Sequence, residues 1–231
     1  MSAIPTRPTR TQLRDQVAEL FREMIFSREL RPGDRIVQTE WAERLGVSRM
    51  PIRNAISRLC AEGVLVIDSE AGSALVTDVR LEDIEDSYAV NATLLSLVGM
   101  RAAERASDED LAAIEKVHDQ MREAVRRDDR GASSGLNRQF HKLIGIAARS
   151  PRLSAMLRLT DLSVPHSTYT VEDWPARSLG EHAGILEAFR TRNGALAGEL
   201  MRRHVESGSE LMLAYIADRD DDANGQDAEG M

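Results

Sequence analysis

The chain has 231 residues and 42 % of them are hydrophobic, which is enough for two domains of modest size. Most of the apolar residues are aliphatic, and this favours helices over sheets. No apolar run reaches the roughly 18 residues of a membrane span, and the first residues lack a signal-peptide core. We therefore expect a cytoplasmic protein with no membrane partner, in which the single Cys60 forms no intrachain disulfide.

The net charge of −8 conceals an uneven distribution of charge along the chain. Residues 1–60 are rich in arginine and carry a net positive charge, whereas the remainder is strongly acidic. From residue 48 to residue 61 there are arginines and no acidic residue. This asymmetry predicts an N-terminal domain that faces an anionic partner, attached to an acidic C-terminal domain.

The first 80 residues show the pattern of a small DNA-binding domain. Residues 1–10 predict a flexible arm, and helix-spaced apolar residues from 13 to 30 predict a helix. Thr39 is expected to cap a short helix that ends near Leu45, and Gly46 permits a sharp turn. Ser48 then caps a second helix that ends at Gly63. The inner face of this helix is expected to consist of Ile52, Ala55, Ile56 and Leu59.

Two β-rich runs, 64–67 and 73–76, follow this helix pair, and a polar segment separates them. They predict a small β-hairpin, so residues 11–78 are expected to form a winged helix-turn-helix. In such a domain the N-terminal turn of the second helix enters the major groove of DNA, where arginine can pair with guanine. The alternative is an ordinary amphipathic helix pair with a solvated arginine face. The residues that we expect to contact DNA are Thr39, Ser48, Arg49, Met50, Arg53 and Arg58, with an ion-pair or solvent role also open for Arg58.

Residues 79–217 read as helical, with breaks that give about six helices in an antiparallel all-α bundle. Ser107 followed by Asp110 resembles a capping box at one helix start. We expect this domain to bind an effector and to form a dimer. The fold class is therefore mainly α, and the acidic segment 218–231 is expected to be a disordered tail.

Three histidines on three predicted helices form a possible metal site. His141 shares a helix face with Asn137, while His182 and His204 lie on the last two helices. Imidazoles that converge inside a bundle can hold a divalent metal ion. Helical histidines also occur as polar surface residues, and we expect that role for His118.

Residues 11–80 resemble the winged-helix domain of the GntR family of bacterial transcription regulators, on the strength of the motif LGVSRMPIRNA at residues 45–55 followed by RL and AEG. Residues 81–217 resemble the helical FCD domain of the FadR branch of that family, through the segments NRQFH, EH with ILEA, and MRRH. The resemblance implies a homodimer that binds a palindromic DNA operator and a small-molecule effector. In the wing, a basic residue common in the family is replaced by Ala71, which follows Glu70.

The resemblance also implies a metal pocket made by one aspartate and three histidines, with the effector beside it. Asn137 takes the place of the aspartate, which leaves a zinc or nickel ion held by His141, His182 and His204, or a metal-free polar pocket. Asn91 and Leu95 stand where relatives carry charged residues, so the effector is expected to be less charged than the family's usual carboxylates. Arg101 or Arg177 could replace the missing charge. The rival function is a metal-dependent hydrolase with Glu181 beside the histidines.

Overall fold

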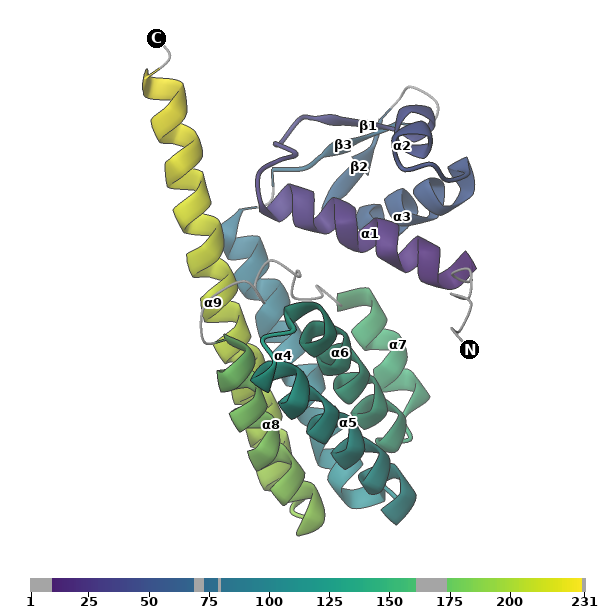
Figure 1. The fold of residues 1–231 in the computed structure, drawn as a ribbon, viewed down its shortest axis with the longest axis vertical. Helices are drawn as coiled ribbons and strands as arrows, with labels where there is room; N and C mark the ends of the chain where they lie inside the picture. The colour runs from purple at the N-terminus through teal and green to yellow at the C-terminus, as the bar shows by residue number, and fades with distance from the viewer. Residues whose placement is uncertain (1–9, 69–72, 79, 161–173, 230–231) are drawn as a thin grey trace. The chain divides into compact units, whose positions relative to one another are not determined.

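A computed structural model of the chain describes residues 10–68, 73–78, 80–160 and 174–229. Within these residues there are nine helices and three short strands, so the expected mainly α fold is confirmed (Figure 1). The chain divides into two compact units, one formed by Leu81–Ala217 and the other by Met1–Arg80 with Asp218–Met231. No described helix combines the length and the apolar character that a membrane span needs.

The first unit contains three helices and a three-stranded antiparallel sheet. Its elements in chain order are α1 (Arg10–Phe26), β1 (Arg35–Val37), α2 (Gln38–Arg44), α3 (Arg49–Ala61), β2 (Leu65–Ile67) and β3 (Ser73–Val76). The strand order is β1-β3-β2, so β3 is central and the predicted hairpin of β2 and β3 gains a third strand. Strand β1 was not predicted from the sequence. It has three residues, and one fully buried residue, Ile36, is too little for an alternating pattern to show.

The four apolar residues expected on the inner face of α3 are all buried. This face packs against α1, and Phe21 of α1 meets the ring of Trp41 of α2 edge to face at 5.0 Å. Beneath this core Arg22, with a fully buried side chain, donates to Glu62 at 2.7 Å. The pair joins α1 to the residue that follows α3. Helix α3 is therefore held against α1 both by its buried face and by its C-terminal end.

Glycine ends both α2 and α3 in the same manner. Gly46 has φ of 63°, its N–H donates to the Glu43 carbonyl, and the next N–H, of Val47, donates to the Ala42 carbonyl. Gly63 has φ of 77° and makes the equivalent bonds at the end of α3. These are Schellman caps, which need a residue in the left-handed region. They produce the sharp turn that the sequence predicted at Gly46.

The caps at the helix starts differ from expectation. Val37 rather than Thr39 is the N-cap residue of α2, so Thr39 lies inside its first turn and the cap prediction is wrong. Ser48 is the N-cap residue of α3 as predicted, but its side chain makes no capping hydrogen bond. Within the described residues, Oγ of Ser48 is therefore not used to cap the helix. Of the arm expected at residues 1–10, residues 1–9 lie outside the described residues, as do the wing residues Glu70 and Ala71, whereas Arg10 begins α1.

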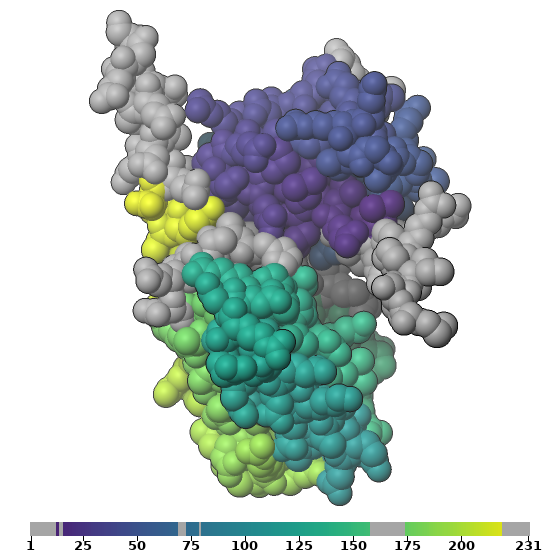
Figure 2. All heavy atoms as spheres, in the orientation of Figure 1, coloured from purple at the N-terminus to yellow at the C-terminus, as the bar shows by residue number. Residues whose placement is uncertain are grey.

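The second unit is a bundle of helices that lie roughly parallel or antiparallel to one another (Figure 1). The helices are α4 (Leu81–Arg105), α5 (Asp108–Arg126), α6 (Arg130–Ala147), α7 (Pro151–Thr160), α8 (Trp174–Arg190) and α9 (Gly194–Glu229), the last of which belongs to this unit up to Ala217. In the space-filling view, the coloured atoms of neighbouring helices touch one another over the visible face of this unit (Figure 2). The expected capping box of Ser107 and Asp110 is present at the start of α5.

The last helix is longer than the sequence suggested. We expected disorder from residue 218, whereas α9 continues to Glu229. Extending an existing helix costs little compared with starting one, and residues 218–229 contain no proline. The polar composition therefore did not mark the end of the helix.

Helices α4 and α9 approach each other closely at two glycines, Gly99 and Gly198. A methyl group on Gly99 of α4 would lie 2.5 Å from Cγ of Met201 and 3.0 Å from the carbonyl oxygen of Ala197. A methyl group on Gly198 of α9 would lie 3.0 Å from the carbonyl oxygen of Ser96. The two backbones can therefore come this near only because both positions lack a side chain.

We predict that Gly99→Ala destabilises the second unit by about 1–3 kcal/mol, because the new methyl group overpacks the α4–α9 contact. The matched control is Gly145→Ala in α6, where nothing lies within 4 Å of the added methyl group. This control should stabilise the protein by about 0.5–1 kcal/mol, because alanine favours the helix. Urea unfolding followed by circular dichroism measures both changes. Equal stability of the two variants would contradict the close approach.

Candidate functional sites

The outer face of α3 is the first candidate site. Ser48, Arg49, Met50 and Arg53 are all exposed, on the side of the helix away from its buried apolar face. Among the described residues, no hydrogen bond or ion pair engages the guanidinium of Arg49. Arg53 donates from Nη2 to Sδ of Met50 at 3.2 Å. Two arginines thus project side by side from the first turns of an exposed helix.

A shallow hollow lies between the start of α2 and the start of α3. It is lined by Gln38, Arg49, Met50 and Arg53. Gln38 was not among the residues predicted to contact DNA, because the motif pointed to the second helix and Thr39 had the sequence of a helix cap. A glutamine at the start of the preceding helix was the available signal, since its amide can pair with adenine in the major groove.

Arg58 lies deeper along α3 and is tied to the protein. Its Nε donates to Oε1 of Glu62 at 2.8 Å, and the other oxygen of Glu62 accepts from Arg22. The side chain of Glu62 is 4 % exposed. The sequence left open either a DNA contact or an ion pair for Arg58, and the structure shows an ion pair with Glu62. Its guanidinium is therefore less available to DNA than those of Arg49 and Arg53.

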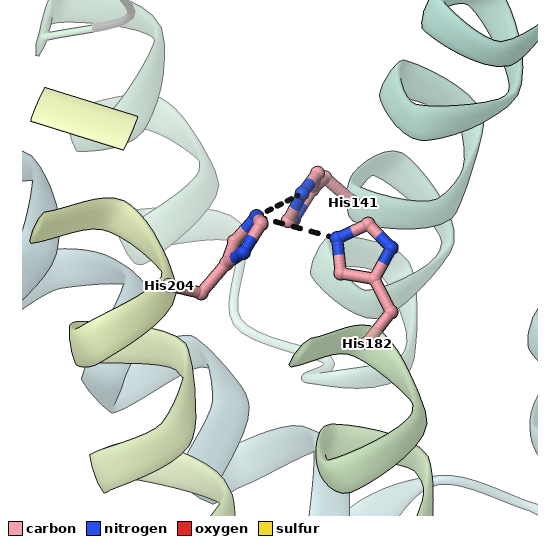
Figure 3. A group of neighbouring side chains, drawn as sticks. All are labelled: His141, His182 and His204. Carbon is pink, nitrogen blue, oxygen red and sulfur yellow. Dashed lines mark hydrogen bonds between the residues drawn. The ribbon is translucent and has the colours of Figure 1, made fainter. Parts of the chain in front are cut away.

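The second candidate site lies inside the helical unit, where the three histidines converge. His141 comes from α6, His182 from α8 and His204 from α9, and their rings point toward one another (Figure 3). Nε2 of His204 lies 3.2 Å from Nε2 of His182 and 3.2 Å from Nε2 of His141. Two nitrogens that ligate one zinc ion at about 2.0–2.1 Å lie roughly 3.3 Å apart at tetrahedral angles. The two spacings from His204 therefore match those of nitrogens that share one metal ion.

Glu181 fixes the orientation of His204. Its Oε2 lies 2.7 Å from Nδ1 of His204, while its Oε1 accepts from Ser207 at 2.9 Å and from Arg177 at 3.2 Å. Although partial burial raises it, these hydrogen bonds lower the pKa of Glu181 overall. An ionised Glu181 accepts a hydrogen bond from Nδ1–H of His204, and in a neutral imidazole of that tautomer the lone pair lies on Nε2. This is the arrangement by which carboxylates orient metal-binding histidines.

The other two histidines are held neutral by burial. Burial, together with the nearby His204, lowers the pKa of His141 to about 3. Burial likewise lowers the pKa of His182, which is fully enclosed, well below its usual value. Neutral imidazole is the form that binds a metal ion, so His141 and His182 have the protonation state that a metal requires.

Aromatic rings pack around the histidines and restrict their movement. Phe140 stacks on His182 with ring centroids 4.1 Å apart. Trp174, at the start of α8, stacks over His204 at 6.1 Å. Both aromatic residues are buried. The imidazoles are therefore positioned by apolar contacts as well as by hydrogen bonds.

Several buried polar atoms beside these rings have no hydrogen-bond partner among the described residues. They include Oδ1 of Asn137, Nε1 of Trp174 and Oγ of Ser178. Asn137 lies one helical turn from His141, and Ser178 lies one turn from both Trp174 and His182. Burying a polar group without a partner costs free energy. A bound ligand that satisfies these groups would remove that cost.

The other residues expected to bind an effector are placed differently. Asn91 of α4 is buried, and its Oδ1 also lacks a partner within the described residues. Arg101 is engaged by Glu104 at 2.9 Å, and Arg177 by Glu181 at 3.2 Å. The two arginines that could replace a missing pocket charge are thus already paired with carboxylates.

The expectation that His118 is a surface residue is wrong. This residue is 4 % exposed, and its Nε2 lies 3.2 Å from the carbonyl oxygen of Leu179 in α8. Its Nδ1 faces Arg122 at 3.4 Å. The charged residues around it in the sequence suggested an exposed face, but α8 covers the histidine. It joins α5 to α8 and is not part of the three-histidine cluster.

Comparison with known families identifies both units. The bacterial regulatory protein family named gntR matches residues 13–75, and the FCD domain family matches residues 86–207. The HTH-type transcriptional regulator YdhC of Bacillus subtilis is 27 % identical over 187 residues, covering 79 % of this chain and 83 % of the relative. The Nta operon transcriptional regulator of Aminobacter aminovorans is 25 % identical over 201 residues, covering 84 % and 91 % respectively.

Solved structures show the same fold. The structure of Escherichia coli McbR/YncC has a TM-score of 0.67 at 21 % identity, covering 87 % of this chain and 96 % of the other. The structure of a GntR transcriptional regulator from Rhodococcus has a TM-score of 0.59 at 21 % identity, covering 87 % and 97 %. At this level of identity the likeness concerns the fold and not the ligand.

Proposed function

Because this chain belongs to the GntR family of bacterial transcription regulators and contains an FCD domain, we propose that it binds a palindromic operator as a homodimer in the cytoplasm. One exposed helix reads only a few base pairs, and a second copy related by two-fold symmetry supplies the remaining specificity. A small metabolite in the FCD domain of this FadR-branch regulator controls the binding by favouring one arrangement of the DNA-binding units.

The observation that carries the DNA-binding proposal is the exposed start of α3. Arg49 and Arg53 are the side chains best placed for base or phosphate contacts, and Ser48 for a phosphate contact. Thr39 is exposed at the start of α2 and stays a predicted contact, whereas Arg58 is the weakest candidate because it is paired with Glu62.

For the FCD domain we propose a divalent metal, zinc or nickel, held by His141, His182 and His204 with Asn137 close by. The convergence of three Nε2 atoms and the carboxylate behind His204 support this assignment. When bound, the ion would offer an open coordination position to an oxygen atom of the effector. The protein's own groups beside it, Asn137 and Ser178, would orient the effector through hydrogen bonds.

The protein is a regulator and not an enzyme, in keeping with its families and relatives. A hydrolytic metal site needs a carboxylate that is free to take a proton from water. Glu181, the carboxylate beside the histidines, is occupied by His204, Ser207 and Arg177. The hydrolase alternative therefore lacks its base.

We predict that Arg49→Ala and Arg53→Ala each weaken selective DNA binding about ten-fold or more, because each removes a contact worth about 1–3 kcal/mol. The probe is the DNA that lies upstream of the protein's own coding sequence, and affinity is measured by fluorescence anisotropy with unrelated DNA as competitor. Arg126→Ala is the matched control, since Arg126 is an exposed arginine of the helical unit. Unchanged binding by both α3 variants, with circular dichroism unaltered, would remove the assignment.

We predict that the purified protein, loaded with zinc or nickel and dialysed, retains one metal ion per chain, and that His141→Ala retains far less. Glu181→Gln should weaken metal affinity about ten- to a hundred-fold, because it loses the charge that orients His204. Glu187→Gln on the same helix is the control, because Glu187 is exposed. Elemental analysis and calorimetry give the stoichiometry and affinity. Absence of metal from the wild-type protein would favour the metal-free polar pocket.

A further inference from the structure

Met50 is an apolar side chain exposed at the tip of the DNA-facing helix. It lies in the first turn of α3, directly after Arg49 and three residues before Arg53. Its side chain is 52 % exposed, while the apolar residues on the opposite face of the helix are buried. Met50 therefore lies outside the apolar core, and about half of its surface is open to a partner outside the chain.

The surroundings of Met50 are polar and suited to base edges. Arg53 lies against its sulfur at 3.2 Å, which holds that guanidinium beside the thioether. Met50 also lines the hollow shared with Gln38, Arg49 and Arg53. One apolar surface is thus surrounded by two groups that pair with guanine and one amide that can pair with adenine.

We propose that Met50 is a specificity-determining residue that reads the C5-methyl group of a thymine in the major groove, an inference that rests on the proposed DNA binding. Thymine is the one DNA base with a methyl group in that groove, and apolar side chains recognise it by direct contact. Methionine is flexible and polarisable, so it adapts to the position of the methyl group. Gln38 in the same hollow is placed to pair with the adenine of such a base pair.

The test removes every thymine methyl group without changing base pairing. The upstream DNA fragment is amplified once with dTTP and once with dUTP, because uracil keeps the O4 acceptor and lacks the methyl group. Wild-type protein should bind the uracil fragment about four-fold more weakly for each half-site contacted, and about sixteen-fold for two half-sites. Met50→Ala should bind both fragments with the same affinity.

Two further variants separate the methyl contact from other effects. Met50→Leu keeps an apolar side chain but loses the sulfur, so it should retain the preference for thymine. Met156→Ala replaces another exposed methionine, in α7, and should behave as the wild type. Equal affinity of the wild-type protein for the two fragments, or an undiminished preference in Met50→Ala, would overturn the inference while leaving DNA binding in place. Absence of selective binding to the thymine fragment would overturn the proposed function and this inference together.

Discussion

The close contact of α9 with α4 is the constraint on which the histidine site depends. Gly99 and Gly198 leave room for the two helices to approach, because a methyl group at either position would lie 3.0 Å from a carbonyl oxygen of the other helix. Helix α9 also carries His204, whose Nε2 is the atom that meets both His141 and His182. A shift of α9 away from the bundle would separate these nitrogens. The packing at Gly198 therefore sets the geometry of the polar cluster around His204, which lies further along the same helix.

The first unit was the more predictable part of the fold, because its signals are local. A glycine after each helix, and apolar residues at helical spacing in α3, are sufficient to place the turn and the buried face. Strand β1 escaped prediction because it consists of three residues whose partner, β3, lies far along the chain. The helix cap at Thr39 was misplaced by two residues, because the strand β1 runs directly into α2 at Val37.

The histidine site was predictable in its members but not in its arrangement. Spacing placed His141, His182 and His204 on separate helices, but only the packed bundle brings their nitrogens within 4.8 Å of one another. The same limit explains the error at His118, whose burial depends on a carbonyl oxygen 61 residues away in sequence. The role of Glu181 was likewise hidden, since adjacency to His182 suggested a catalytic base, whereas its partner is His204 on another helix.

Glu62 has a consequence for the way in which the protein would find its operator. This one carboxylate is shared by Arg22 and Arg58, so the deeper part of α3 presents little net positive charge. Neutralising phosphates releases counterions from DNA, and the salt dependence of binding follows the number of phosphates contacted. A short basic surface on a protein of net charge −8 releases few counterions. Affinity for random DNA would then be low, and the protein would spend little of its time on sites without the correct bases.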